Sequence, residues 1–562
     1  MPPPAAVNID VAAQAVDDNS ASTTPAYLTV LGVDELRANS VFSGGIAALG
    51  LSDAFKSKSN TKKPVSKDFT YRLTLESKSR QVGATCVILS GGTYANVVPQ
   101  PSPLKQAARY LSREGMISLG GGLPSSAYFP FDHVSVGVPG DNLFSETDIH
   151  EYAQKVTIGM HDMREGKSAY DLSVALNYGQ GSGSPQMVRW VTEHTEIVHN
   201  PPYQDWASVM TVGSTSAFEM CLRSFCNRGD YFIADEYAFC SAIEAGRGLG
   251  IEAVGIHMDS EGMIPSHLDE VLSKWDEKAR KAPKPFLIYL VPTGQNPTGS
   301  TQGTQRRREI YALAQKHDLI IIEDEPYYFL QMDKYVPGGN QNSAAPKSHE
   351  EFLKSLTPSY LSMDPEGRVI RLDSFSKVIA PGSRCGWLTT SSKICERLMR
   401  HNEVTVQAPS GFSQAILFKL LDEHWGHGKY LDWLVHIRKE YSTRRNIMLE
   451  ACEKYIPKEV ATWTPPAAGM FLWFKINSEK HPAHGKKAST AIEHDIFEAV
   501  VDQKTLLAKG SWFFAGPEGT DPSVYLRATF AAAEERAMVE GIRRFASALR
   551  VTFGLPALQE SA

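Results

Sequence analysis

The chain has 562 residues, of which 42% are hydrophobic and 21% charged, a composition typical of a folded protein with a sizeable core. Its 57 basic and 63 acidic residues leave a net charge of -6, and no block of like charge indicates a nucleic-acid or membrane surface. The seven cysteines are scattered without a CxxC pair, which argues against a disulfide framework or a zinc site.

Residues 1–100 are interpreted as a largely irregular arm, because they are rich in Ala, Ser, Thr, Lys and Gly and have weak periodicity. The beginning of the chain carries Asp10 and Asp17 but no arginine before Arg37, which is unlike a mitochondrial transit peptide or a secretory signal. No apolar run approaches the roughly 18 residues of a membrane span. We therefore expect a cytoplasmic protein with no membrane partner.

Five short apolar segments, separated by stretches long enough for helices, indicate the core of the next region. The segments are SVMTVGS (208–214), YFIADE (231–236), FLIYLVP (286–292), LIIIEDE (319–325) and RVIRLDS (368–374). Each ends in polar residues or glycine, a pattern that predicts a mostly parallel sheet with helices on both faces. We expect this α/β domain to cover residues 136–415.

Helical spacing predominates beyond the large domain. The helical segments are 414–421, 430–455 and 534–553, and GMFLWFKI (469–476) is a strand between them. We expect a smaller α+β domain at 416–553, to which residues 101–135 contribute, and a tail at 554–562.

Polar residues directly after the strands are candidates for ligand binding, since ligands gather at the carboxyl ends of parallel strands. Ser214 and Thr215 stand at the start of a helix, where free backbone N–H groups and hydroxyls form a site for an anion such as phosphate. The same residues also suit an ordinary helix cap. Asn296 lies in a Gly-rich turn, where Asn-Pro is common for conformational reasons alone.

Two further strand ends carry charged side chains. Asp324 and Tyr327 follow a very apolar strand, where a carboxylate is costly to bury unless a cation pairs with it. A loop acid that caps the next segment is equally compatible with Asp324. The stretch RLDSFSKVIAPGSRCGW (371–387) places Lys377 after two serines and before Arg384. Such a lysine is a poor core residue, so solvent or a ligand must take its charge.

Taken in chain order, Gly-Ser-Thr, Asn-Pro, Asp-x-x-Tyr and Ser-x-Ser-Lys followed by Arg384 resemble the pyridoxal phosphate site of the fold type I aminotransferases. The segments SPLKQAARYL, LNYGQGSGSP, AAGMFLWFK and YLRATF extend the resemblance to fungal aromatic amino acid aminotransferases and the related kynurenine and 2-aminoadipate aminotransferases. The resemblance covers roughly residues 100–550. It implies a PLP-dependent transferase fold of type I, with a sheet of seven-stranded type and a smaller domain.

The resemblance also implies a role for each residue at the strand ends. Lys377 would form the Schiff base with the cofactor's aldehyde and move protons during the reaction. Asp324 would pair with the pyridine nitrogen, and Asn296 and Tyr327 would donate to the phenolate oxygen. Phe239 would stack on the ring. The phosphate would be bound by Ser214, Thr215, Ser374, Ser376 and Arg384.

The implied reaction moves an amino group from an aromatic amino acid to a 2-oxo acid such as 2-oxoglutarate by a ping-pong mechanism. Arg527 would bind the substrate's carboxylate, and Tyr178 would reach the neighbouring site across a homodimer interface. Residues expected to line an apolar side-chain pocket are Gly122, Leu123, Tyr128 and Phe471, of which Phe471 also suits an ordinary core position. Lys105 stands where some kynurenine-type relatives carry arginine, so selection of an acidic side chain does not carry over.

Other functions are compatible with parts of this pattern. A kynurenine or 2-aminoadipate aminotransferase, or a PLP enzyme that decarboxylates or eliminates, would use the same cofactor residues. A non-catalytic aminotransferase-like regulator would need a DNA-reading module, but the arm has no helix-turn-helix pattern and no basic face. The histidine pairs in EHWGHGKY and HPAHGKK lack nearby cysteines or a second ligand pair, so we expect no metal.

Residues 82–100, VGATCVILSGGTYANVVPQ, depart from the resemblance, which implies that LTLESKSRQ runs directly into PSPLK. The codons of Val82 and Gln100 are compatible with GT and AG intron boundaries, and removal of the segment restores RQPSPLK. We hypothesise a retained in-frame intron, with a surface loop as the alternative.

Overall fold

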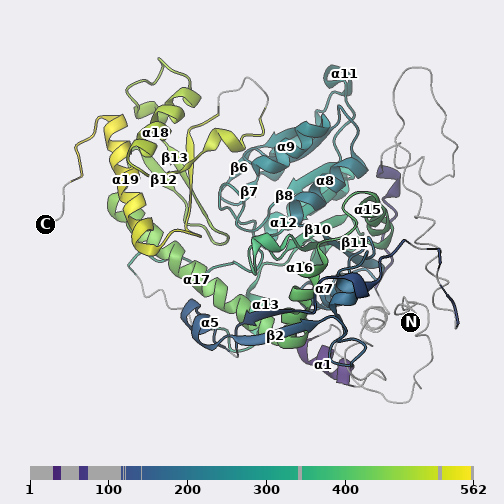
Figure 1. The fold of residues 1–562 in the computed structure, drawn as a ribbon. Coiled ribbons are helices and arrows are strands. Elements are labelled where there is room, and N and C mark those ends of the chain that lie inside the picture. Colours follow the sequence, from purple (N-terminus) through teal and green to yellow (C-terminus); the bar gives the residue numbers. More distant parts are fainter. Residues whose placement is uncertain are drawn as a thin grey trace. The chain divides into compact units, whose positions relative to one another are not determined.

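The computed structural model describes residues 29–38, 63–73 and 115–558, apart from 118, 121, 141, 339–344 and 517–521. The segment 82–100 and Lys105 lie outside the described residues. The chain divides into two compact units, which are Met1–Cys226 with Pro358–Trp433 and Asn227–Thr357 with Leu434–Ala562. Figure 1 labels some of the helices and strands of each unit.

The large sheet has seven strands, and the first unit holds three of them. In spatial order these are β3 (Trp206–Thr211), β11 (Gly386–Ser391) and β10 (Val369–Ser374). Strand β11 runs antiparallel to both neighbours, and every residue of β10 and β11 is buried. The end of β10 leads directly into the turn that carries Lys377.

Helices and a hairpin complete the first unit. They are α1 (Val30–Ala38), β1 (His133–Val138), α5 (Glu146–Tyr152), β2 (Gln154–Gly159), α6 (Leu172–Ala175), α7 (Pro185–His199), α8 (Ser214–Phe225), α14 (Tyr360–Met363), α15 (Ser392–Val404) and α16 (Gly411–Phe418). Helix α8 packs on β3, β10 and β11, while α15 packs on β3 and β11.

The second unit holds the other four strands of the large sheet. In spatial order they are β9 (Ile320–Asp324), β8 (Leu287–Leu290), β4 (Tyr231–Asp235) and β5 (Glu252–Ile256). Strand β4 pairs in parallel with β5 and β8, and β8 pairs in parallel with β9. Strands β8 and β9 are buried along their whole length, as expected for parallel strands covered on both faces. The carboxyl ends of β4 and β9 lie at the same edge of the sheet, where Asp235 and Asp324 stand.

The second unit also contains an antiparallel sheet in the order β12-β13-β15-β14. Its strands are β12 (Ala461–Trp463), β13 (Phe471–Ile476), β14 (Ala508–Lys509) and β15 (Tyr525–Thr529). The other elements are α9 (Cys240–Leu249), β6 (Met258–Asp259), β7 (Gly262–Met263), α10 (Pro265–Ser273), α11 (Glu277–Arg280), α12 (Thr304–His317), α13 (His349–Ser355), α18 (Ser489–Asp502) and α19 (Glu535–Phe553). Helix α17 (Gly426–Tyr455) starts in the first unit and ends in the second.

The five apolar segments of the sequence form β3, β4, β8, β9 and β10, which confirms the predicted sheet. The helical segments correspond to α16, α17 and α19, and GMFLWFKI contains β13. Helix α19 buries Met538, Ile542, Phe545 and Leu549, which lie three or four residues apart on one face. Among the described residues, every helix is too short or too polar to cross a membrane.

Candidate active site

The turn after β10 gathers hydroxyls around a cation in the first unit. Ser374 Oγ donates to Ser376 Oγ at 2.8 Å, and the backbone N–H of Ser376 donates to Ser374 Oγ at 3.1 Å. Arg384 Nη1 donates to Ser376 Oγ at 3.3 Å, although the arginine side chain is otherwise exposed. Lys377 follows directly and is half-buried. Four side chains of this turn therefore supply two hydroxyls, a guanidinium and a primary amine.

The start of helix α8 faces the same guanidinium. Gly213 is the N-cap with φ of 84°, a backbone conformation that strains any residue with a side chain. A Cβ there would lie 2.5 Å from Arg384 Nη2, so the guanidinium would also have to shift. Arg384 Nη2 also donates to the carbonyl of Val212 at 3.1 Å. Ser214 Oγ is buried and has no hydrogen-bond partner among the described residues, while Thr215 is exposed. A helix N-terminus, an unsatisfied hydroxyl and a guanidinium together form a cradle for an anion.

We call these residues the lysine group: Ser214, Thr215, Ser374, Ser376, Lys377 and Arg384. The structure brings all of them to two adjoining features of the first unit, the α8 N-terminus and the turn after β10.

A buried acid marks the end of β9 in the second unit. Asp324 is 6% exposed, and Tyr289 Oη donates to its Oδ2 at 2.8 Å. Burial and the neighbouring Asp324 carboxylate raise the pKa of Tyr289 well above its usual value, so this phenol stays a donor. Sequence reasoning missed Tyr289. Its signal was a hydroxyl in the middle of an otherwise apolar strand, which must find a partner when buried.

Asn296 and Arg527 meet in the second unit. Arg527, on β15, donates from Nη1 to Asn296 Oδ1 at 2.6 Å. Its guanidinium lies 4.3 Å from the ring centre of Phe471 and 4.7 Å from that of Phe513, an arrangement of cation–π contacts. Burial lowers the pKa of Arg527 from its usual value. Phe471 is thus a contact of the candidate carboxylate-binding residue as well as a core side chain.

Tyr327 is buried close to these residues. Its ring meets that of Phe471 edge-on at 5.9 Å. Burial raises the pKa of Tyr327 first, and the Asp324 charge raises it further, while Arg527 opposes the shift. The hydroxyl therefore remains protonated over the working pH range and can act as a donor. We call the residues Tyr289, Asn296, Asp324, Tyr327 and Arg527 the acid group.

A second buried carboxyl lies beside the Asn296 turn. Asp235, at the end of β4, accepts from Gln295 Nε2 at 3.2 Å, and burial raises its pKa to about 7. Gln295 Nε2 also donates to the carbonyl of Tyr237 at 2.6 Å. The next turn leads to Phe239, the half-buried N-cap of α9. Sequence reasoning missed Asp235 and Gln295, since neither belongs to a recognisable motif.

The remaining predicted site residues lie on the surface of the first unit. Leu123, Tyr128 and Tyr178 are 56%, 84% and 72% exposed in the single chain, and Gly122 is also exposed. One candidate histidine pair contacts protein groups: His424 Nε2 lies 3.0 Å from the carbonyl oxygen of Pro139, and His427 Nε2 lies 2.9 Å from Glu193 Oε2. Within the described part of the chain, no three His, Cys, Asp or Glu side chains are grouped to hold a metal.

Known proteins resemble this chain over most of its length. The family described as aminotransferase class I and II matches residues 159–545. An aromatic amino acid aminotransferase of Schizosaccharomyces pombe is 42% identical over 490 residues, covering 87% of this chain and 98% of that protein. An L-tyrosine:2-oxoglutarate aminotransferase of Tapinella panuoides is 34% identical over 389 residues, covering 68% and 73%. The crystal structure of aminotransferase Aro8 from Candida albicans matches with a TM-score of 0.79 and 39% identity, over 88% of this chain and all of that one (100%).

Proposed function

The chain belongs to the class I and II aminotransferases, and on this premise we propose that it transfers the amino group of an aromatic amino acid to a 2-oxo acid such as 2-oxoglutarate. Its fold is that of the fold type I aminotransferases, as the sequence predicted. The observation that carries the proposal is the buried acid group, in which an acid, two phenols, an amide and a guanidinium are held in contact or close proximity.

Pyridoxal 5'-phosphate fits the donor sets of the two units. The unsatisfied Ser214 Oγ and the cradle above Gly213 suit a phosphate, which Thr215, Ser374, Ser376 and Arg384 would also bind. Lys377 supplies the primary amine that the cofactor's aldehyde requires. When bound, the cofactor supplies an electron sink for the substrate's α-carbon.

Each member of the acid group would have a separate task toward that cofactor. Asp324 would keep the ring nitrogen protonated, and Tyr289 fixes the orientation of its carboxylate. Because Arg527 donates to Asn296 Oδ1, the amide nitrogen of Asn296 is the atom that would donate to the phenolate oxygen. The Tyr327 hydroxyl would be the second donor to that oxygen, and Phe239 would stack on the ring.

Two basic side chains would act on the substrate. Arg527 would bind the α-carboxylate with both guanidinium nitrogens, and its two flanking rings exclude water from the pair. Lys377 would take the proton from the substrate's α-carbon and deliver it to the carbon of the cofactor's former aldehyde, which is general acid–base catalysis by one amine. The keto acid leaves, and the second 2-oxo acid accepts the amino group in the reverse steps.

An aromatic side chain would be accommodated by an apolar pocket that includes Phe471, with Gly122, Leu123 and Tyr128. The relatives named for aromatic amino acids and for tyrosine support this choice. We also propose a homodimer in which Tyr178 reaches the partner's cofactor. The high exposure of Tyr178 in the single chain supports that proposal. Sedimentation of the purified protein at twice the chain mass would be the expected result.

One experiment separates these functions. The purified chain is supplied with pyridoxal 5'-phosphate, 2-oxoglutarate and a panel of phenylalanine, tyrosine, tryptophan, kynurenine and 2-aminoadipate. We expect glutamate and the matching keto acid in equal amounts, fastest with an aromatic donor. Preference for kynurenine or 2-aminoadipate would change the substrate assignment. Release of carbon dioxide or ammonia, or no turnover with any donor, would contradict the proposed reaction.

A further inference from the structure

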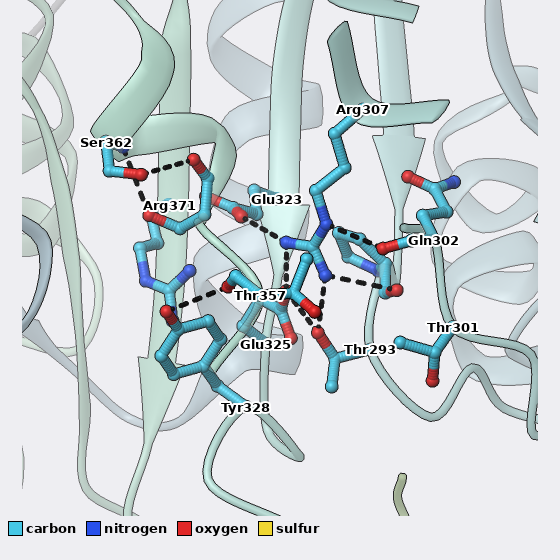
Figure 2. A network of polar contacts seen from close by, with 12 residues as sticks. Thr293, Thr301, Gln302, Arg307, Glu323, Glu325, Tyr328, Thr357, Ser362 and Arg371 are labelled. Atoms are coloured by element: carbon cyan, nitrogen blue, oxygen red, sulfur yellow. Dashed lines mark hydrogen bonds and ion pairs between the residues drawn. The ribbon is translucent and has the colours of Figure 1, made fainter. Parts of the chain in front are cut away.

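A fully buried arginine, Arg307 on α12, stands at the centre of the polar network in Figure 2. Its guanidinium donates to the carbonyl of Gln302 from Nε (3.1 Å), to the carbonyl of Pro292 from Nη2 (3.3 Å) and to Thr293 Oγ1 from Nη2 (2.8 Å). These acceptors stand at the two ends of the segment 292–302, which carries Asn296. We call this segment the Asn296 loop. One side chain therefore joins both ends of the loop.

The same guanidinium also binds the end of strand β9. Nη1 lies 3.3 Å from Glu325 Oε1 and 3.6 Å from Glu323 Oε1, and both carboxylates are fully buried. Thr293 Oγ1 donates to Glu325 Oε1 at 2.9 Å, which closes the network. Since successive side chains of a strand alternate, Glu323 points to the face opposite Asp324. Glu325 follows directly after the strand and shares the Arg307 guanidinium with Glu323. Arg307 thus holds the residues immediately before and after Asp324.

We infer that Arg307 is a positioning residue, which fixes Asn296 and Asp324 relative to each other so that both meet the cofactor ring in register. This inference rests on the proposed function. Arg307 contacts the two ends of the Asn296 loop and the residues on either side of Asp324, and we assign it no contact with cofactor or substrate. The planar guanidinium donates to four acceptors and forms an ion pair with Glu323, a geometry that a lysine ammonium cannot reproduce.

A purely structural role would have a different signature. In that case Arg307 would only compensate the charges of two buried carboxylates, and its replacement would lower stability without changing the cofactor's environment. A positioning role predicts a change at the cofactor itself. If Asn296 donates less well to the phenolate oxygen, the cofactor's anion is less stabilised, and the Lys377 nitrogen linked to it becomes more basic.

The decisive comparison is Arg307→Lys against Arg308→Lys, an exposed position on the same helix. Both proteins are saturated with pyridoxal 5'-phosphate, and the visible absorbance of the bound cofactor is titrated with pH. For Arg307→Lys we expect kcat to fall about 10- to 100-fold. The KM for the amino acid should stay within about threefold. The absorbance midpoint should rise by about one pH unit. Arg308→Lys should match the parent chain in all three.

A folded Arg307→Lys protein with the parent's absorbance midpoint would overturn the inference, even if its melting temperature were lower. Should that variant fail to fold, the triple variant Arg307→Met, Glu323→Gln, Glu325→Gln removes the unbalanced charge and is judged by the same titration. Measurements on the parent chain separate a failure of the proposed function from a failure of the role assigned to Arg307. If the parent shows no cofactor absorbance, the proposed function fails. If the parent does and the variant matches it, only the role of Arg307 fails.

Discussion

The lysine group and the acid group achieve charge balance in different ways. In the first unit, hydroxyls, a helix N-terminus and an exposed guanidinium leave positive charge facing outward, with Ser214 Oγ unsatisfied. In the second unit, Asp324 is buried with a phenol bonded to it, and Arg527 is bonded to an amide between two aromatic rings. The first group requires an anion to complete it, whereas each charged side chain of the second already has a hydrogen-bond partner within its own unit.

This difference decides how each group should respond to substitution. Loss of a hydroxyl from the lysine group removes one of several donors to a phosphate, so the others can still hold it. Loss of a member of the acid group leaves a buried polar partner without its bond, which costs more than the bond was worth. We therefore expect the effect of each substitution to follow the charge that it removes, and not the number of contacts that it removes.

The largest effect is expected for Lys377→Ala, which removes the only amine of the lysine group. Turnover should fall by about 10⁴-fold or more, because the same side chain binds the cofactor and moves the proton. Borohydride reduction followed by peptide mapping checks the covalent link directly.

The matched control is Lys393→Ala, which removes a half-exposed lysine bonded to Asp68 at 2.8 Å on the surface. It should retain activity and borohydride labelling. Labelling of the Lys377→Ala protein at another lysine, with turnover preserved, would contradict the assignment of the covalent link to Lys377.

Asp324→Asn should have the next largest effect. The amide keeps the shape and can still accept from Tyr289 Oη, but it cannot hold the ring nitrogen protonated. We expect kcat to fall about 10³-fold. Tyr289→Phe leaves the carboxylate in place and removes only the orienting bond, for which we expect about a 10-fold loss.

The pair of variants separates charge from orientation in the acid group. Both are followed by single-turnover kinetics with the cofactor bound, so that weaker cofactor binding is not mistaken for slower chemistry. Equal losses for Asp324→Asn and Tyr289→Phe would show that orientation, and not charge, dominates this group.

Arg527→Lys should raise the KM for the amino acid about 10- to 100-fold, with a smaller change in kcat. Lysine keeps the positive charge but loses the planar fork that binds a carboxylate and also donates to Asn296. The exposed Arg536→Lys on α19 is the control. Steady-state kinetics with the preferred donor are sufficient, and an unchanged KM would remove Arg527 from the substrate site.

The two groups also differ in how far the sequence could predict them. The turn from Ser374 to Arg384 is contiguous, so its hydroxyls, lysine and arginine could be recognised together, and the sheet that presents it followed from apolar strand periodicity. Asp324 could be singled out as a carboxylate at the end of an apolar strand, but its role, and Arg527 altogether, could be proposed only through a family resemblance. Their contacts come from strands far apart in the chain, which local patterns do not pair.

Partners with no motif of their own could not be predicted at all. In the sequence, Tyr289 is an ordinary aromatic residue of a buried strand, and Arg307 is one of three adjacent arginines in a polar helix. Helical periodicity places Arg307 on the inner face, but the identity of its acceptors depends on how the 292–302 turn closes. That closure is a tertiary property, which propensity and spacing do not specify.

The smallest effect concerns Asp235, the buried carboxyl next to Gln295. Burial raises its pKa from 3.8 to about 7, so between those values the folded chain keeps a proton that the unfolded chain has lost. Stability from this group is therefore fully present at low pH and declines by about 1.4 kcal/mol per pH unit as the pH rises toward 7. Asp235→Asn removes this dependence and still accepts from Gln295 Nε2. The melting temperature of the variant, relative to the parent, should rise between pH 5 and pH 7.5, whereas a constant difference would mean that Asp235 is ionised in the folded chain.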